Sequence, residues 1–107
     1  MSTQSNTNKC SAHELQILGD YWTLSIIQVL SASEKRFSEI ERELASINPT
    51  TLSNRLKKLE EQGLIVRKEE TVDKLSVVYA LTDKGIGILP ILKQIKLFAE
   101  KYLSKSS

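Results

Sequence analysis

Hydrogen-bond donors and positive charges gather on one short stretch of the chain, residues 50 to 58. The stretch contains no acid, and the first acid after it is Glu60. Its polar and basic members are Thr50, Thr51, Ser53, Asn54, Arg55, Lys57 and Lys58. Asn and Arg side chains can form paired hydrogen bonds with the edges of adenine and guanine, and Lys and Arg neutralise phosphates. The stretch therefore offers noncovalent recognition of bases and phosphates, and the alternative is an ordinary solvated helix face.

The residues around this stretch predict that it lies on an amphipathic helix. Asn48 is a favourable N-cap, Pro49 suits the first helical position and Gly63 suits the end, so we expect a helix from about 49 to 62. At about 100° per residue, its apolar side consists of Leu52, Leu56 and Leu59. The predicted base-reading residues are Thr51, Asn54 and Arg55. The predicted phosphate-binding residues are Lys57 and Lys58.

The elements on either side of this helix predict a helix-turn-helix with a wing. Ser38 and Glu41 form a capping box for a preceding helix, whose apolar positions are Phe37, Ile40, Leu44 and Ile47. The joint between the two helices is short, which fits a helix-turn-helix over residues 38–62. Two β-rich runs then predict a hairpin over residues 64–81 in the place of a wing. Further candidates for DNA contact, near the base of this hairpin, are Arg67 and Lys68.

Two helices are expected before this unit. Ser11 and Glu14 form a capping box for a short first helix that Gly19 ends. Asp20 can cap a second helix. The apolar positions of the second helix are Trp22, Ile26, Val29 and Leu30.

The last helix carries more apolar surface than one domain face needs. We expect this helix to run over residues 82–103, with Thr82 as its cap and a kink at Pro90. Left exposed, so wide a stripe would favour aggregation, whereas a twofold pairing would bury it. The residues expected in a dimer interface are Leu15, Leu18, Ile88, Ile91, Leu92, Ile95, Phe98 and Tyr102.

Composition limits the remaining classes. The chain has 107 residues, a net charge of +2, one Cys and one His, so it predicts a single domain with no internal disulfide and no clustered metal site. No uncharged apolar run is long enough for a membrane span, and the first residues do not resemble a signal peptide. We expect a cytoplasmic protein. A paired nucleophile and base and a phosphate-binding glycine loop are both missing, so we expect neither an enzyme nor a cofactor.

Four short motifs carry a family resemblance. They are "LGDYW" at 18–22, "RFSEI" at 36–40, "LKKLEEQGLIVR" at 56–67 and "YALTDKG" at 79–85. In this order the chain resembles the HxlR-type (MarR-like winged helix) transcriptional regulators over roughly residues 10–103. The resemblance implies a homodimer that binds an operator, with the first and last helices in the dimer interface.

The chain departs from the family pattern at the wing and at its cysteine. The second wing strand reads "SVVY" where the family often has Lys-Val-Glu-Tyr, and the wing tip is rich in acids. Some relatives use a cysteine before the first helix to sense oxidants or electrophiles, which makes Cys10 a possible redox sensor. Here Ser11 replaces the family's proline after that cysteine, and an idle thiol is the alternative.

The sequence thus predicts a mainly α fold with a small β-hairpin, a winged helix-turn-helix domain with extra N- and C-terminal dimerisation helices. We expect a disordered tail over residues 1–9, the domain over 10–103 with its dimerisation helix at 82–103, and a tail at 104–107. The predicted function is a homodimeric transcriptional regulator that binds double-stranded DNA at a near-palindromic operator. The alternative is a winged-helix protein-interaction module without DNA binding. The operator, the regulated genes, the sign of regulation and the effector stay open.

Overall fold

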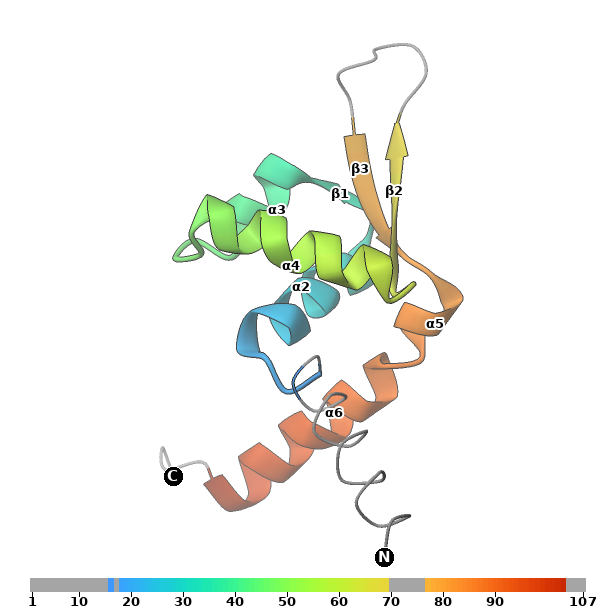
Figure 1. Cartoon of the computed structure of the whole chain (residues 1–107). Coiled ribbons are helices and arrows are strands. Elements are labelled where there is room, and N and C mark those ends of the chain that lie inside the picture. The colour runs from blue at the N-terminus through green and yellow to red at the C-terminus, as the bar shows by residue number, and fades with distance from the viewer. Residues whose placement is uncertain (1–15, 17, 70–76, 104–107) are drawn as a thin grey trace, which may run out of the picture.

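The computed structural model describes residues 16, 18–69 and 77–103. Helices α2, α3 and α4 surround an apolar core beside a small sheet, and α6 extends away from them (Figure 1). The elements are α2 (Tyr21–Ala32), β1 (Lys35–Arg36), α3 (Phe37–Glu43), α4 (Pro49–Glu61), β2 (Ile65–Glu69), β3 (Val77–Leu81), α5 (Asp83–Ile86), α6 (Leu89–Phe98) and the π-helical turn η1 (Ala99–Leu103). The predicted mainly α winged-helix fold is confirmed.

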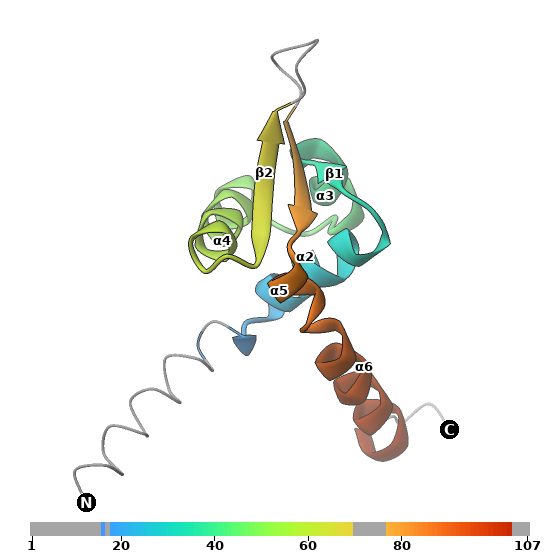
Figure 2. The ribbon, with the colours of Figure 1, turned by 90° about the vertical axis from the view of Figure 1, so that its right-hand side faces the viewer.

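The sheet has three antiparallel strands in the order β1-β3-β2. Tyr79 in the central strand pairs with Lys35 on one side and with Arg67 on the other. The predicted hairpin is confirmed, and it projects from the helices in both views (Figures 1 and 2). Strand β1 was missed, because two residues are too short to show the alternation by which a strand is predicted.

The start of α3 differs from the prediction. The helix begins at Phe37, and Glu39 accepts a hydrogen bond from the backbone N–H of Arg36 at 2.8 Å. The predicted capping box of Ser38 and Glu41 is therefore wrong. Arg36 is still extended because it pairs in the sheet, so the helix begins directly after the strand.

The joint between α3 and α4 is short, as predicted, although α3 ends earlier than its apolar pattern suggests. Leu44 closes the helix, and the backbone N–H of Ile47 donates to the Leu44 carbonyl at 2.8 Å in the turn. Ile47 is buried from this turn rather than from a helix. Asn48 then caps α4, and its Oδ1 accepts from the N–H of Thr50 at 2.7 Å.

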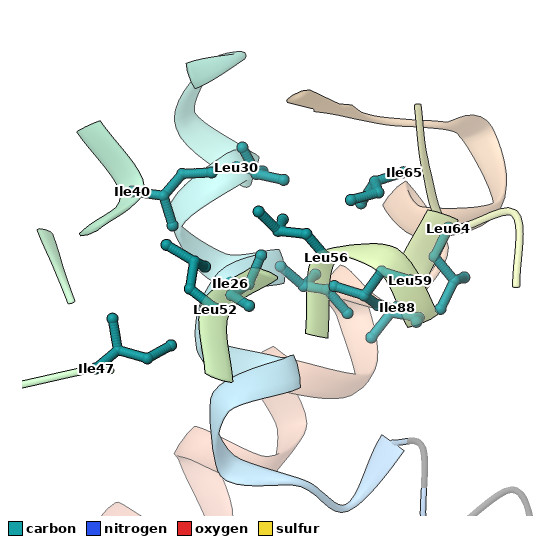
Figure 3. Packing of buried hydrophobic residues seen from close by; sticks show 11 residues of the cluster. Ile26, Leu30, Ile40, Ile47, Leu52, Leu56, Leu59, Leu64, Ile65 and Ile88 are labelled. Carbon is teal, nitrogen blue, oxygen red and sulfur yellow. The ribbon is translucent and has the colours of Figure 1, made fainter. Parts of the chain in front are cut away.

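One apolar cluster holds these elements together (Figure 3). The three leucines on the apolar side of α4 are at most 2% exposed, which confirms the predicted side of that helix. Helix α2 contributes Ile26, Ile27 and Leu30 to the cluster. Trp22 and Val29 of the same helix are partly buried and pack against the edge of the cluster. Truncating a buried leucine to alanine typically costs about 2–5 kcal/mol, so this cluster holds the position of α4 against α2.

The end of α4 is a Schellman motif. Gly63 has φ of +77°, the Leu64 N–H donates to the Leu59 carbonyl at 2.9 Å, and the Gly63 N–H donates to the Glu60 carbonyl at 3.0 Å. Glycine suits this left-handed position because it has no Cβ. Leu64 and Leu59 are both buried, which is the apolar contact that accompanies the motif.

The same turn is tied to the start of α5. The Thr82 hydroxyl donates to the Gly63 carbonyl at 2.6 Å and accepts from the N–H of Gly85 at 3.1 Å, while the Thr82 N–H donates to the Leu64 carbonyl at 3.1 Å. Thr82 is the predicted cap of a helix. Two of the four sequence motifs therefore meet here, the end of α4 and the "LTDKG" segment.

The prediction of one continuous helix over 82–103 is wrong. This segment forms two helices, α5 and α6, which are separated at Gly87 and Ile88. Pro90 lies in the first turn of α6 instead of kinking a continuous helix. Proline is well tolerated there because its missing N–H has no partner within the helix in any case. The division turns α6 away from the hairpin and α4 (Figure 2).

Replacing Gly85 should strongly destabilise the domain. A Cβ at this position would lie 2.1 Å from the backbone carbonyl oxygen of Leu64, so the Schellman turn or α5 must move. We expect Gly85→Ala to lower the free energy of unfolding by about 1–3 kcal/mol or more in urea denaturation. The matched control is Gly87→Ala, whose Cβ would lie 3.2 Å from the Lys84 carbonyl oxygen. Equal losses in the two variants would contradict this assignment.

Candidate nucleic-acid interface

The side of α4 that faces away from the core carries most of the predicted contact residues. The exposed ones are Thr50, Ser53, Asn54, Lys57 and Lys58, and Thr51 is half-buried. Helix α4 has no acid in its first turn, and Asn48 satisfies the first free N–H groups, so the N-terminal half presents donors and partial positive charge. The structure thus brings these six residues to one continuous surface beside the hairpin.

Arg55 does not lie on that surface as a free side chain. Its Nε donates to Asp20 Oδ2 at 2.8 Å and its Nη2 donates to Asp20 Oδ1 at 3.2 Å. The ion pair is partly buried, with side chains 29% and 26% exposed. The edge of the guanidinium formed by Nε and Nη2 is thus bonded to a carboxylate, so base reading by Arg55, which stays a prediction, would need the Nη1–Nη2 end of the group or an opened pair.

Asp20 serves both α2 and α4. As the N-cap of α2 its Oδ2 also accepts from the N–H and the hydroxyl of Thr23, each at 2.9 Å. Hydrogen bonding from Arg55 is the main reason why the pKa of Asp20 falls to about 2, with the Thr23 bonds adding to it against a smaller opposing effect of burial. The sequence showed Asp20 as a cap but gave no signal of its partner 35 residues away.

The basic residues of the wing have acidic neighbours. Arg67 pairs with Glu69 at 3.5 Å, and Lys68 pairs with Glu34 at 3.0 Å. All four side chains are about half exposed, so each pair contributes only about 0–1 kcal/mol to stability. The acidic wing tip that follows Glu69 lies outside the described residues.

The predicted dimer residues divide into two groups. Four apolar side chains of α6 and η1 are exposed by half or more and form the α6 stripe: Ile91, Ile95, Phe98 and Tyr102. The rings of Phe98 and Tyr102 are in contact, with centroids 4.9 Å apart. Ile88 is only 7% exposed and belongs to the core of its own domain, which corrects its assignment to an interface. Leu18 and Leu92 pack against the same core.

Some predicted features cannot be located. Leu15 and Cys10 lie outside the described residues, so the redox role of Cys10 stays a prediction. Within residues 16, 18–69 and 77–103, no three His, Cys, Asp or Glu side chains group as metal ligands. None of the helices in that part of the chain has the length and apolarity that a bilayer crossing requires.

Residues 17–107 match the HxlR-like helix-turn-helix family. The chain belongs to that family. It is 39% identical over 84 residues to the uncharacterized HTH-type transcriptional regulator BH0655 of Halalkalibacterium halodurans, covering 78% of this chain and 74% of the relative. It is 36% identical over 92 residues to the uncharacterized HTH-type transcriptional regulator YvaP of Bacillus subtilis, covering 86% and 85%. These names describe regulators and not enzymes.

The fold agrees with this membership. The structure of the reduced form of the transcriptional regulator YodB from Bacillus subtilis superposes with a TM-score of 0.77 at 29% identity, covering 85% of this chain and 89% of YodB. Helix α4 and the β2–β3 hairpin are then the second helix of the helix-turn-helix and the wing of an HxlR-like domain.

The Asp20–Arg55 ion pair should give the domain an acid-dependent stability. Since the pKa of Asp20 is lowered from 3.8 to about 2 in the folded state, the unfolded chain binds this proton first as the pH falls. The stabilisation is complete above about pH 4 and is lost towards pH 2. We expect it to be on the order of 1–2 kcal/mol, because solvent screens a pair that is about a quarter exposed.

The measurement is urea unfolding of the wild type and of Asp20→Asn at several pH values between 2 and 5. Asparagine keeps the cap but cannot titrate. The other acids are common to both proteins, so the difference between the two curves isolates Asp20. Parallel curves across this window would contradict the assignment.

Proposed function

We propose that this protein is a sequence-specific, DNA-binding transcriptional regulator that acts as a homodimer on a near-palindromic operator. The observation that carries the proposal is the exposed side of α4, which presents amide, hydroxyl and ammonium donors and no acid before Glu60. The buried leucines on the opposite side hold this surface outward. In a helix-turn-helix, such a helix enters the major groove with its N-terminal residues nearest the bases.

The exposed residues of α4 are assigned two roles, base contact or phosphate contact, according to their position along the helix. Asn54, with Thr50, Thr51 and Ser53, lies in the half of α4 nearest the bases, where an amide can pair with an adenine edge. Lys57 and Lys58 follow one turn later and are assigned to phosphates. Arg67 and Lys68 of the wing can add phosphate contacts when they exchange their acidic partners.

The dimer is supported by the α6 stripe. Its four side chains are 50–62% exposed in one chain, and they lie on a helix that points away from its own core (Figure 1). A second copy related by a twofold axis would cover them with the same stripe. Two α4 helices would then be offered to one face of DNA about one helical turn apart, ~34–36 Å.

The second candidate is a protein-interaction module that does not bind DNA. It is favoured by the mild net charge of +2 and by the acidic partners of both wing cations. An electrophoretic mobility shift with random-sequence duplex DNA at low salt separates the two. Retention of DNA supports the regulator, whereas no retention favours the module.

Two substitutions on α4 should affect binding in different ways. Asn54→Ala should cost about 1–3 kcal/mol on a duplex that the wild type selects from its own genome, and should relax the preference at one base position. Lys57→Ala should weaken all duplexes alike and lower the slope of log affinity against log salt by about one. The matched control is Lys93→Ala, which removes the same charge from α6. If Asn54→Ala binds the selected duplex like the wild type, α4 does not read bases.

A charge in the α6 stripe should weaken the dimer and DNA binding together. Ile95→Glu places a carboxylate where the partner's apolar side chains are proposed, so we expect more monomer in analytical ultracentrifugation at tens of micromolar, and lower operator affinity. The control is Leu97→Glu, since Leu97 is similarly exposed at 47% but points about 130° away from the centre of the stripe. A wild type that sediments as a monomer would contradict the dimer.

A further inference from the structure

We propose that Arg55 and Asp20 form a clamp that sets the orientation of α4, so that Arg55 acts on DNA recognition as a positioning residue without touching the DNA. The inference rests on the proposed DNA-binding function and goes beyond it. Its basis is the bidentate pair between the middle of α4 and the first residue before α2.

The clamp has a rigid base. The carboxylate of Asp20 accepts two hydrogen bonds from Thr23 and two from Arg55. Together these four bonds fix the rotation of the carboxylate. Thr23 is buried, at 5% exposure, and belongs to the same helix that packs Ile26 and Ile27 into the core. The guanidinium of Arg55 is therefore held by a group that the core itself immobilises.

The apolar contacts of α4 hold it against α2, but they constrain its rotation less sharply than directional bonds do. The burial of its leucines is favourable in any arrangement that removes them from water, since the hydrophobic effect has no direction. Paired N–H···O bonds depend on angle as well as distance. Among the residues that the structure describes, no other side chain of α4 is hydrogen-bonded to a different element. At the C-terminal end, the carbonyls of Gln62 and Gly63 accept hydrogen bonds from Lys84 and Thr82. Arg55 therefore makes the side-chain bond that lies nearest the N-terminal half of α4, which is proposed to contact bases.

The charges argue against a free arginine. If Arg55 turned to the DNA, the carboxylate of Asp20 would lose its charged partner in a partly buried place. An unpaired charge there is costly, and charge-assisted pairs are strong. The adjacent residue Asn54 is exposed, so a small rotation of α4 would displace it from a base edge while leaving the helix folded.

The test is a double-mutant cycle with Asp20→Asn, Arg55→Ala and both together, in the full chain. Affinity is measured on a duplex selected from random sequence by the wild type and on unselected random duplex. We expect Asp20→Asn to weaken the selected duplex about tenfold, the order of one lost base contact, and to leave random duplex unchanged or slightly tighter. The double variant should lose no more than Arg55→Ala alone. Arg55→Lys, which keeps the charge but loses the fork, should show the same selective loss.

The opposite pattern overturns the clamp. If Asp20→Asn binds both duplexes as tightly as the wild type or more tightly, while Arg55→Ala weakens them, Arg55 contacts DNA directly. A second readout needs no DNA, namely the amide resonances of Thr50, Ser53 and Asn54 in the Asp20→Asn protein. Movement of these resonances supports the clamp, and unchanged resonances overturn it. If the wild type selects no duplex, the proposed function is refuted. The clamp is still tested in that case, because the amide resonances report on it without DNA.

Discussion

The burial of one side of α4 is the constraint on which the rest of the structure depends. Leu52, Leu56 and Leu59 are buried in the core, where Leu52 lies near Ile26 of α2 and Leu59 lies near Ile88 (Figure 3). A helix has only one opposite side, so the same packing decides that Thr50 and Asn54 face solvent. The core and the proposed recognition surface are two sides of one element, and a change in its packing would be felt at its surface.

Hydrogen bonds complete what the apolar contacts leave free. At the C-terminal end, the Schellman turn at Gly63 is bonded to Thr82, which connects α4 to the sheet and to α5. In the middle, Arg55 bonded to Asp20 connects α4 to α2. The two ties differ in chemistry, because the first uses backbone carbonyls and a hydroxyl, whereas the second uses a charged pair and is therefore sensitive to acid.

The C-terminal segment shows how one apolar pattern can serve two surfaces. Ile88 and Leu92 pack against the core of their own domain, and Ile91 and Ile95 remain exposed on the neighbouring side of the same segment. The division at Gly87 lets α5 stay with the sheet while α6 leaves it. The exposed side is therefore the surface left after the domain has completed its own core, which is why it is the proposed site of a second copy.

The sequence by itself determined the features that depend on near neighbours along the chain. The caps Asp20, Asn48 and Thr82 and the side of α4 that is buried were predicted correctly, because capping and helical periodicity act within a few residues. Only the tertiary structure decided that β1 pairs with β3, that Ile88 turns inward, and that Arg55 is bonded to Asp20. Each depends on contacts between residues far apart in the chain, and the spacing of residue types carries no record of which distant side chain will be the partner.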